Sequence, residues 1–289
     1  MKVGFIGTGV MGQSLVRHLM AAGYQVYIYN RTKTKALPLI AEKAIWCDTI
    51  KDLAMQCDVI MTMVGYPNDV KDVYFNVDHG ILNYAQAGSL LIDLTTSTPS
   101  LAKEIAQYGK QRKLDVIDAP VSGGDSGAKN ATLTIMCGGT KAAYQRALPF
   151  LNCFGKNIVL QGEAGSGQHT KMCNQIAIAA NMIGVCEAIS YARKANLEPS
   201  LVLDSIAYGA AASWQLTNNG QKILANDDTP GFYIKHFIKD MKIALDEAKA
   251  MNLELPGLKL VESLYEELAQ AGYNDLGTQA LIAWYQKQG

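Results

Sequence analysis

The chain has 289 residues, which exceeds the usual size of one domain and predicts one large or two medium-sized domains. Hydrophobic residues make up 49% of the chain and charged residues 18%, which is ordinary for a globular protein with a full core. Lysine plus arginine equals aspartate plus glutamate at 26 each, so the zero formal charge gives no electrostatic reason to expect nucleic acid or a membrane as a partner.

Short apolar runs alternate with amphipathic stretches up to about residue 160. The runs at residues 2–6, 25–29, 59–64, 89–93, 115–117 and 132–136 predict strands, because each is bounded by a turn signal or a polar residue. Helical patterns lie between them, for example at 11–22, 34–42, 69–74 and 100–113; Thr98 is the predicted N-cap of the last, with Pro99 in its first position. This alternation predicts a parallel, doubly wound α/β sheet of the Rossmann type over residues 1–163.

The pattern changes after residue 165. Residues 168–194 contain no proline and one glycine, enough for a helix of about 40 Å. Apolar residues surround most of its circumference, which predicts a helix buried on all sides. Further helical patterns follow at 199–207, 213–224, 234–251, 257–271 and 278–286 without a competing strand. We therefore expect an all-α C-terminal domain over residues 164–289.

The cysteines and histidines show no metal-ligand spacing. We therefore expect no metal site. The six cysteines are expected to be free buried thiols in a reducing compartment; they are Cys47, Cys57, Cys137, Cys153, Cys173 and Cys186. The N-terminus lacks the pattern of a signal peptide, and the longest nearly apolar run, residues 176–186, is about half of what a membrane span needs. The expectation is a soluble, cytoplasmic protein.

A glycine loop follows the first predicted strand. Its sequence, Gly7-Thr8-Gly9-Val10-Met11-Gly12, fits G-x-G-x-x-G and opens the first predicted helix, which is the context that dinucleotide binding requires. Gly7 allows the tight turn, Gly9 lets the backbone approach a pyrophosphate, and Gly12 lets the helix pack close to the strand. The helix N-terminus then faces the phosphates, so the loop predicts a nicotinamide cofactor. The alternative is a glycine turn without a ligand.

The end of the second strand bears on the choice of cofactor. A carboxylate there would favour NAD, but this chain has Asn30-Arg31-Thr32. Asn, Arg and Thr can donate hydrogen bonds to a 2′-phosphate, and Arg adds a positive charge. The residues therefore favour NADP. Binding of NAD stays possible if Arg31 stacks only on the adenine.

Two segments carry the predicted chemistry. The loop Ser122-Gly123-Gly124 offers backbone amides and a hydroxyl, which suit a substrate carboxylate; alternatively it is an ordinary glycine-rich loop. Lys171 lies in the first turns of the apolar helix, where an unpaired ammonium group is costly. Burial lowers the pKa of an ammonium group, so Lys171 would be a good proton donor near neutral pH. Alternatively, Lys171 is an ordinary lysine near a helix start whose ammonium group reaches the surface.

With the glycine loop, three segments resemble the β-hydroxyacid dehydrogenase family: Asp118-Ala-Pro-Val-Ser-Gly-Gly124, Gly165-Ser-Gly-Gln-His-Thr-Lys-Met-Cys-Asn174 and Lys239-Asp240. The family includes 3-hydroxyisobutyrate dehydrogenase, tartronate semialdehyde reductase and glyoxylate/succinic semialdehyde reductases. The resemblance implies that Lys171 is the general acid/base and that Ser122, Gly123 and Gly124 hold the substrate's acid group. It also implies a helper amide, which we assign to Asn174, although many relatives carry it where this chain has Gln175.

Further cofactor contacts follow from the same resemblance. They are Val64 and Gly65, where relatives usually have Leu-Pro, then Thr96 near the nicotinamide ribose, and Lys239. Together with Gly7, Thr8, Gly9, Val10, Met11, Asn30, Arg31 and Thr32 they form the predicted cofactor site. Trp214 lies where family members line the substrate's tail, or belongs to the core.

These observations predict an oxidoreductase that transfers hydride between NADP(H) and a short β-hydroxy acid/semialdehyde pair. We expect a small carboxylate-bearing substrate and a homodimer or homotetramer. One alternative is an imine reductase on the same scaffold, although those relatives typically lack the lysine at position 171. The other is a non-catalytic NADPH-binding sensor.

Overall fold

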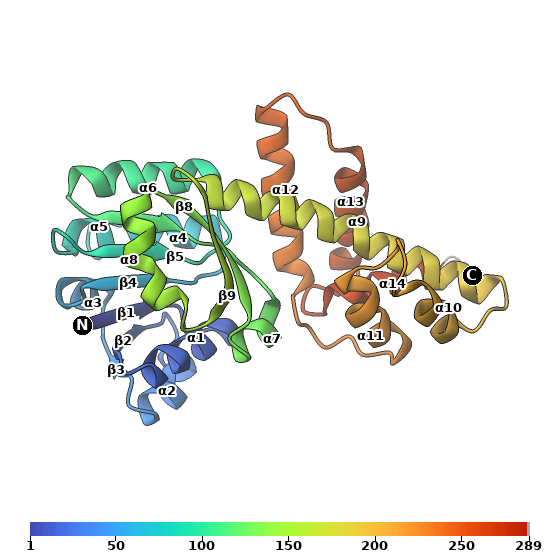
Figure 1. Ribbon diagram of the computed structural model, residues 1–289, viewed down its shortest axis with the longest axis horizontal. Helices are drawn as coiled ribbons and strands as arrows, with labels where there is room; N and C mark the ends of the chain where they lie inside the picture. The colour runs from blue at the N-terminus through green and yellow to red at the C-terminus, as the bar shows by residue number, and fades with distance from the viewer. Residues whose placement is uncertain (288–289) are drawn as a thin grey trace. The chain divides into compact units, whose positions relative to one another are not determined.

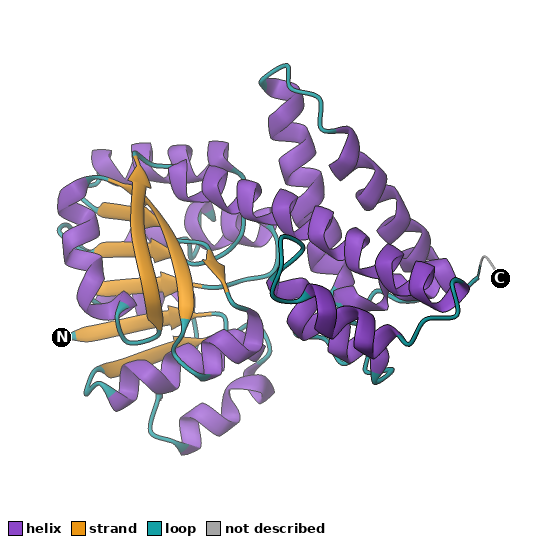
Figure 2. Ribbon diagram, turned by 45° about the vertical axis from the view of Figure 1, so that its right-hand side comes forward, coloured by secondary structure: helices purple, strands orange, loops and turns teal. Residues whose placement is uncertain are grey.

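The computed structural model describes residues 1–287 and divides into two compact units. The first unit runs from Met1 to Lys171 and the second begins at Met172 (Figure 1). The first holds all the strands of the sheet and the second is built from helices (Figure 2). The doubly wound α/β fold followed by an all-α part is therefore confirmed.

Six parallel strands form the main part of the sheet. In spatial order they are β3 (Ile45–Trp46), β2 (Gln25–Tyr29), β1 (Lys2–Ile6), β4 (Val59–Thr62), β5 (Leu90–Asp93) and β6 (Asp115–Asp118). The order 3-2-1-4-5-6 is that of the Rossmann fold, in which ligands bind beyond the carboxyl ends of the strands where the order reverses. Here the order reverses between β1 and β4.

The remaining edge of the sheet differs from the prediction of a wholly parallel sheet. Strand β8 (Leu133–Gly139) runs antiparallel to β6 and to β7 (Val121–Ser122), whereas β9 (Gly155–Gly162) runs parallel to β8. A parallel crossover needs a dozen or more residues, and the β7–β8 connection, which includes α7 (Gly124–Lys129), is shorter. Strands β3 and β7 have two residues each and β9 is half exposed, so none shows a clear hydrophobic pattern.

Two hydrophobic clusters pack against the sheet, because successive side chains of a strand point to opposite faces. Val3 and Phe5 belong to one cluster, and Ile6 and Ile60 to the other. The surrounding helices are α1 (Val10–Ala21), α2 (Leu37–Ala41) with its preceding 3₁₀ turn, α3 (Ile50–Gln56), α4 (Pro67–Phe75), α5 (Ile81–Tyr84), α6 (Pro99–Gln111) and α8 (Lys141–Leu151). The predicted cap of α6 is confirmed, since Thr98 Oγ1 accepts a hydrogen bond from Leu101 N at 3.2 Å.

Helix α9 (Ser166–Lys194) continues from the first unit into the second and is the long yellow helix of Figure 1. The prediction that it is buried on all sides is wrong, because Cys173, Ala177, Ala180, Gly184 and Tyr191 are exposed. For the same reason, one of the thiols expected to be buried is exposed. The helix has the length and composition of a membrane span, with a mean hydropathy of 1.3 over its most apolar window, as core helices of soluble proteins also do.

The second unit packs its helices around one core. They are α10 (Pro199–Ile206), a π-helical turn at Gln215–Asn219, α11 (Gly220–Leu224), α12 (Ile234–Ala250), α13 (Pro256–Gln270), a 3₁₀ turn at Thr278–Leu281 and α14 (Ile282–Gln286). Phe237 of α12 and Tyr265 of α13 are fully buried at the centre, with their rings edge to face at 5.3 Å. Among residues 172–287 the only β pairing is an isolated bridge between Tyr233 and Gly277.

Candidate functional site

The glycine loop connects β1 to α1 as the motif predicts. Gly7 has φ +101°, and a Cβ on Gly12 would lie 2.1 Å from Gly7 O, so both glycines are required by the close turn. A Cβ on Gly9 would meet no atom within 4 Å, and no side chain caps the amides that begin α1. Open space above a glycine and uncapped helix amides are what a pyrophosphate needs, so these residues fit a dinucleotide.

Two side chains of the segment after β2, Asn30 and Arg31, have different contacts. Asn30 Oδ1 accepts a hydrogen bond from Thr8 N at 3.0 Å, and Asn30 Nδ2 donates to Thr32 O at 2.8 Å, so this amide holds the glycine loop in place. Arg31 is 88% exposed and lies 3.4 Å from Asp69 Oδ1 on α4. The guanidinium is therefore the accessible positive charge at the end of β2.

The loops after β4 and β5 are tied together by a buried carboxylate. Asp93 Oδ1 accepts hydrogen bonds from Thr62 Oγ1 at 2.7 Å and from Thr95 N at 3.1 Å. Thr95 Oγ1 in turn accepts from Val64 N at 3.0 Å. Burial raises the pKa of Asp93 to about 6. The hydrogen bonds from Thr62 and Thr95 oppose this increase in pKa, and the nearby charge of Asp118 adds to it. The network fixes the segments that contain the predicted cofactor contacts Val64, Gly65 and Thr96.

Lys171 lies beside the predicted carboxylate loop within the first unit. Its side chain is buried, with 6% of the residue exposed, and its Nζ donates a hydrogen bond to Val121 O at 2.9 Å. Val121 directly precedes Ser122, and Gly123 adopts φ +129° at the turn of the loop. The structure thus brings together a lysine and a loop that are separated by about 50 residues in the sequence.

Asp118 stabilises the start of the helix that contains Lys171. Its Oδ1 accepts a hydrogen bond from Gly165 N at 2.8 Å and its Oδ2 accepts from Gln168 N at 3.0 Å. Burial raises the pKa of Asp118 to about 6, although these backbone donors oppose the increase. Asp118 belongs to the Asp118–Gly124 motif but had no predicted role; its position at the end of a strand and before a loop was the available signal.

In the second unit the two candidate helper amides form one hydrogen-bonded series. Asn174 Nδ2 donates to Gln175 Oε1 at 2.7 Å, and Gln175 Nε2 donates to Asp240 Oδ2 at 2.7 Å. Asp240 Oδ1 lies 3.1 Å from Lys239 Nζ. Gln175 is fully buried, whereas Asn174 is half-buried, so Asn174 is the more accessible amide and Gln175 orients it.

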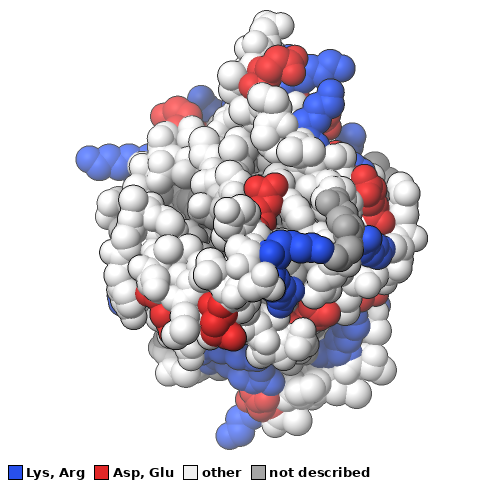
Figure 3. All heavy atoms as spheres, turned by 90° about the vertical axis from the view of Figure 1, so that its right-hand side faces the viewer, with Lys and Arg blue, Asp and Glu red and all other residues white. Residues whose placement is uncertain are grey.

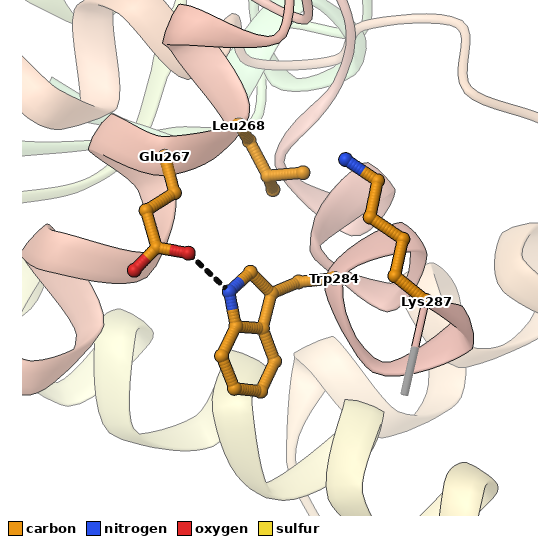
Figure 4. Close-up of a pocket in the computed structure, with 4 residues that line it drawn as sticks. All are labelled: Glu267, Leu268, Trp284 and Lys287. Carbon is orange, nitrogen blue, oxygen red and sulfur yellow. Dashed lines mark hydrogen bonds between the residues drawn. The ribbon is translucent and has the colours of Figure 1, made fainter. Parts of the chain in front are cut away.

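Two further features belong to the second unit. Trp214 is 61% exposed, so it does not belong to the core. A pocket of about 290 Å³ on α13 and α14 is lined by Glu267, Leu268, Trp284 and Lys287, and Trp284 Nε1 donates to Glu267 Oε2 at 2.7 Å (Figure 4). It contains none of the predicted site residues. Within residues 1–287 no group of three or more His, Cys, Asp or Glu could hold a metal ion.

Two family models together match almost the whole chain. Residues 2–162 match the NAD-binding domain of 6-phosphogluconate dehydrogenase, and residues 165–285 match the NAD-binding domain of NADP-dependent 3-hydroxyisobutyrate dehydrogenase. The chain is also 34% identical to 2-hydroxy-3-oxopropionate reductase of Escherichia coli, over 98% of this chain and 96% of that protein. This chain belongs to the β-hydroxyacid dehydrogenase family.

Other similarities agree with this membership. An uncharacterized oxidoreductase of Bacillus subtilis is 55% identical over 99% of both chains. The structure of Psf3 in complex with NADP⁺ and 2-OPP matches with a TM-score of 0.90 and 27% identity over 97% of this chain and 99% of that one. An imine reductase of Myxococcus stipitatus is 20% identical with a TM-score of 0.65 over 98% of this chain and 99% of that one, which shows a shared fold alone. The protein is an NAD(P)-dependent hydroxyacid dehydrogenase.

Proposed function

We propose that the protein is an NADP-dependent reductase that converts a short semialdehyde bearing a carboxylate into the β-hydroxy acid, with Lys171 as general acid. The observation that carries the proposal is the position of Lys171, buried and 2.9 Å from the carbonyl oxygen that precedes the Ser122–Gly124 loop. A proton donor therefore lies next to a loop of backbone amides and a hydroxyl that suit a carboxylate. This is the pair of functions that reduction of a semialdehyde acid requires.

Each residue of the site has a defined task in the reaction. The Ser122 hydroxyl and the amides of Gly123 and Gly124 bind the substrate carboxylate, which sets the carbonyl beside Lys171. Bound NADPH supplies the hydride that reduces the carbonyl carbon. Lys171 Nζ donates a proton to the carbonyl oxygen and takes it back in the oxidative direction. Asn174 orients the substrate hydroxyl, and Lys239 contacts the cofactor.

The role of Lys171 is tested by replacing it with methionine, which keeps the aliphatic stem. NADPH consumption with a panel of three- and four-carbon semialdehydes is expected to fall by about 10² to 10⁴-fold, the usual contribution of a general acid. NADPH binding, measured by calorimetry, is expected to persist. Lys110→Met on the surface of α6 is the matched control and should keep wild-type turnover. Retained turnover in Lys171→Met would falsify the assignment.

The preference for NADP rests on Arg31. Its exposed guanidinium and the absence of a carboxylate at the end of β2 favour a 2′-phosphate, and the NADP⁺ complex of Psf3 and the name of the second family model agree with this choice. Asp69 Oδ1 lies 3.4 Å from Nη1 of Arg31.

Replacing Arg31 with leucine is expected to raise the KM for NADPH by about 10 to 100-fold, because a charge-assisted hydrogen bond is lost. The KM for NADH should stay the same. Steady-state kinetics with both coenzymes measures this difference, and Arg112→Leu at the end of α6 is the control for loss of a surface arginine. An equal increase for both coenzymes would show that Arg31 only stacks on the adenine.

The two alternative functions make different predictions. An imine reductase would reduce cyclic imines faster than semialdehydes, and the buried Lys171 speaks against it, since the relatives with that activity typically lack the lysine. A non-catalytic sensor would bind NADPH and turn over no member of the panel. The substrate panel with NADPH and NADH therefore separates all three.

We also propose that the protein is a homo-oligomer formed through the exposed face of α9. Exposed positions 173, 177, 180, 184, 187 and 191 alternate in steps of four and three, the spacing of helices that pair along their length. The neighbouring α10 exposes Leu201, and a groove of about 280 Å³ there is lined mainly by aliphatic residues. Figure 3 shows another side of the molecule, on which charges of both signs lie scattered among uncharged areas.

A further inference from the structure

Gln168 is a fully buried polar residue in the first turn of α9, three residues before Lys171. Both ends of its side-chain amide are bonded to the loop between β5 and α6. Nε2 donates to Thr95 O at 2.7 Å, and Oε1 accepts from Ser97 N at 3.0 Å. The amide therefore contacts the residues on both sides of Thr96, which is the predicted contact of the nicotinamide ribose.

The backbone of the same turn is fixed from another strand. Asp118, at the end of β6, accepts hydrogen bonds from the backbone N–H groups of Gly165 and Gln168. The first turn of α9 lies close to the backbone of β6 and β8, since a Cβ on Gly167 would lie 2.4 Å from Met136 O and 2.8 Å from Asp118 O. A shift of Gln168 would therefore break contacts to the end of β6 and to the β5–α6 loop.

The loop that Gln168 contacts is itself tied to the rest of the cofactor-binding edge. Thr95 donates its N–H to Asp93 and accepts a hydrogen bond from Val64 N through its hydroxyl. Gln168 is thus the side chain through which the segments after β4 and β5 are joined to the turn that contains Lys171. Every contact in this series lies within the first unit.

We propose that Gln168 is a positioning residue, whose side-chain amide sets the distance between the nicotinamide-side loop Thr95–Ser97 and Lys171. The proposal rests on the proposed function, because it concerns the alignment of the cofactor and the general acid. No other side chain bonds to both Thr95 O and Ser97 N among the contacts of residues 1–287. An apolar replacement would leave both backbone groups buried and unpaired, and the loop would move to find new partners.

Replacing Gln168 with methionine, which has a similar length and no hydrogen bonds, tests the proposal. We expect kcat for semialdehyde reduction to fall by about 10²-fold, because a displacement of about 1 Å at the reacting groups has that effect. The Kd for NADPH should change by less than about threefold, since the glycine loop and Arg31 bind the other end of the cofactor. The kinetic isotope effect on kcat with NADPH deuterated at the transferred position should rise as the misaligned step becomes rate-limiting.

Two further variants separate positioning from loss of stability. Gln168→Glu keeps the acceptor for Ser97 N and loses the donor to Thr95 O when ionised, so we expect a kcat between those of wild type and Gln168→Met. Gln279→Met is the matched control, because Gln279 is equally buried and donates to Asp227 O and Thr229 O in the second unit. It should lower Tm and leave kcat and the isotope effect unchanged.

Hydrogen exchange decides the proposal independently of activity. Gln168→Met should speed amide exchange in the peptide that spans Thr95–Ser97, and Gln279→Met should not. If the wild-type protein reduces no semialdehyde, the proposed function fails while this measurement still reports on the contact. Wild-type kcat and isotope effect in Gln168→Met, or unchanged exchange at Thr95–Ser97, would overturn the positioning role.

Discussion

Three buried charged side chains near the carboxyl ends of β5 and β6 are hydrogen-bonded, and all but one of their partners lie far away in the sequence. Lys171 donates to Val121 O, Asp118 accepts from the start of α9, and Asp93 accepts from Thr62 and the backbone of Thr95. Buried charged groups are costly unless they are hydrogen-bonded. Their partners here are mostly backbone atoms of the loops that the proposed reaction uses, so these charges determine the loop conformations.

Two glycines of the first loop are predicted to respond differently to an added methyl group. Gly9→Ala should change the free energy of unfolding by less than about 0.5 kcal/mol, because its Cβ meets no atom, and should abolish NADPH binding by filling the approach to the helix amides. Gly12→Ala should cost a few kcal/mol, since its Cβ would lie 2.1 Å from Gly7 O.

Urea unfolding and calorimetric titration with NADPH measure both effects. Gly23→Ala is not a suitable control, because its φ of +89° strains any other residue. Gly257→Ala serves better, since its Cβ meets no atom and it lies in the helical unit. Tight NADPH binding by Gly9→Ala would contradict the proposed course of the pyrophosphate.

At the scale of elements, α9 has two different surfaces along its length. Met182, Val185 and Ile189 are buried in the core of the second unit, whereas the exposed side carries small residues from position 173 to 184 and then Glu187 and Tyr191. The sequence pattern alone showed an apolar helix and could not distinguish burial within one chain from burial between two. Hydrophobicity is the same signal in both cases.

Ala180→Glu on the exposed side of α9 is expected to convert the proposed oligomer into monomers, because it places a charge among the small uncharged residues of the proposed interface. Multi-angle light scattering measures the change in molar mass. Ala250→Glu, at another exposed alanine of the second unit, is the matched control and should leave the mass unchanged. A wild-type protein that is monomeric at micromolar concentration would contradict the proposed interface.

At the scale of the whole molecule, the chain combines two separate cores. The first unit has one hydrophobic cluster on each face of its sheet, and the second has a single helical core. The titratable groups with raised pKa that lie beneath the proposed site, Asp93 and Asp118, belong to the first unit. The stability of this unit is therefore expected to depend on pH in a way that the second unit does not share.

Burial raises the pKa of Asp93 from 3.8 to about 6, so the folded state binds a proton more tightly than the unfolded state does. The free energy of unfolding is therefore expected to fall as the pH rises from about 4 to about 6. Asp93→Asn keeps an acceptor for Thr62 and Thr95 and should remove the contribution of Asp93 to this decrease, leaving that of Asp118. At about pH 7.5 it should be more stable than wild type by about 2 to 3 kcal/mol.

Urea unfolding at several pH values measures the profile in the first unit when Trp214 and Trp284 are replaced by phenylalanine, so that Trp46 is the one tryptophan left to fluoresce. Trp46 reports on this unit because it lies on β3. Asp78→Asn, at an exposed position after α4, is the control and should leave the profile unchanged. A profile that is flat in wild type between about pH 4 and 6 would contradict the raised pKa.

Sequence alone predicted the dinucleotide loop, five of the six parallel strands and the helical second half, and it made Lys171 the proposed general acid. These features depend on local signals: the spacing of glycines, the period of apolar residues and a lysine in an apolar helix. At the antiparallel edge, β8 was predicted at residues 132–136 but its direction was not, because only the short β7–β8 connection sets it. Strands β7 and β9 escaped prediction because β7 has two residues and β9 is half exposed.

Only the tertiary structure decided what Lys171 contacts and which residues hold it there. Its partner Val121 O, the capping carboxylate of Asp118 and the bridge from Gln168 to the β5–α6 loop join residues that are 47 to 73 positions apart. Backbone carbonyls and N–H groups have no signature in the sequence, because every residue carries them. The fold selects which of them meet a buried side chain, and at this site that selection aligns the groups of the proposed reaction.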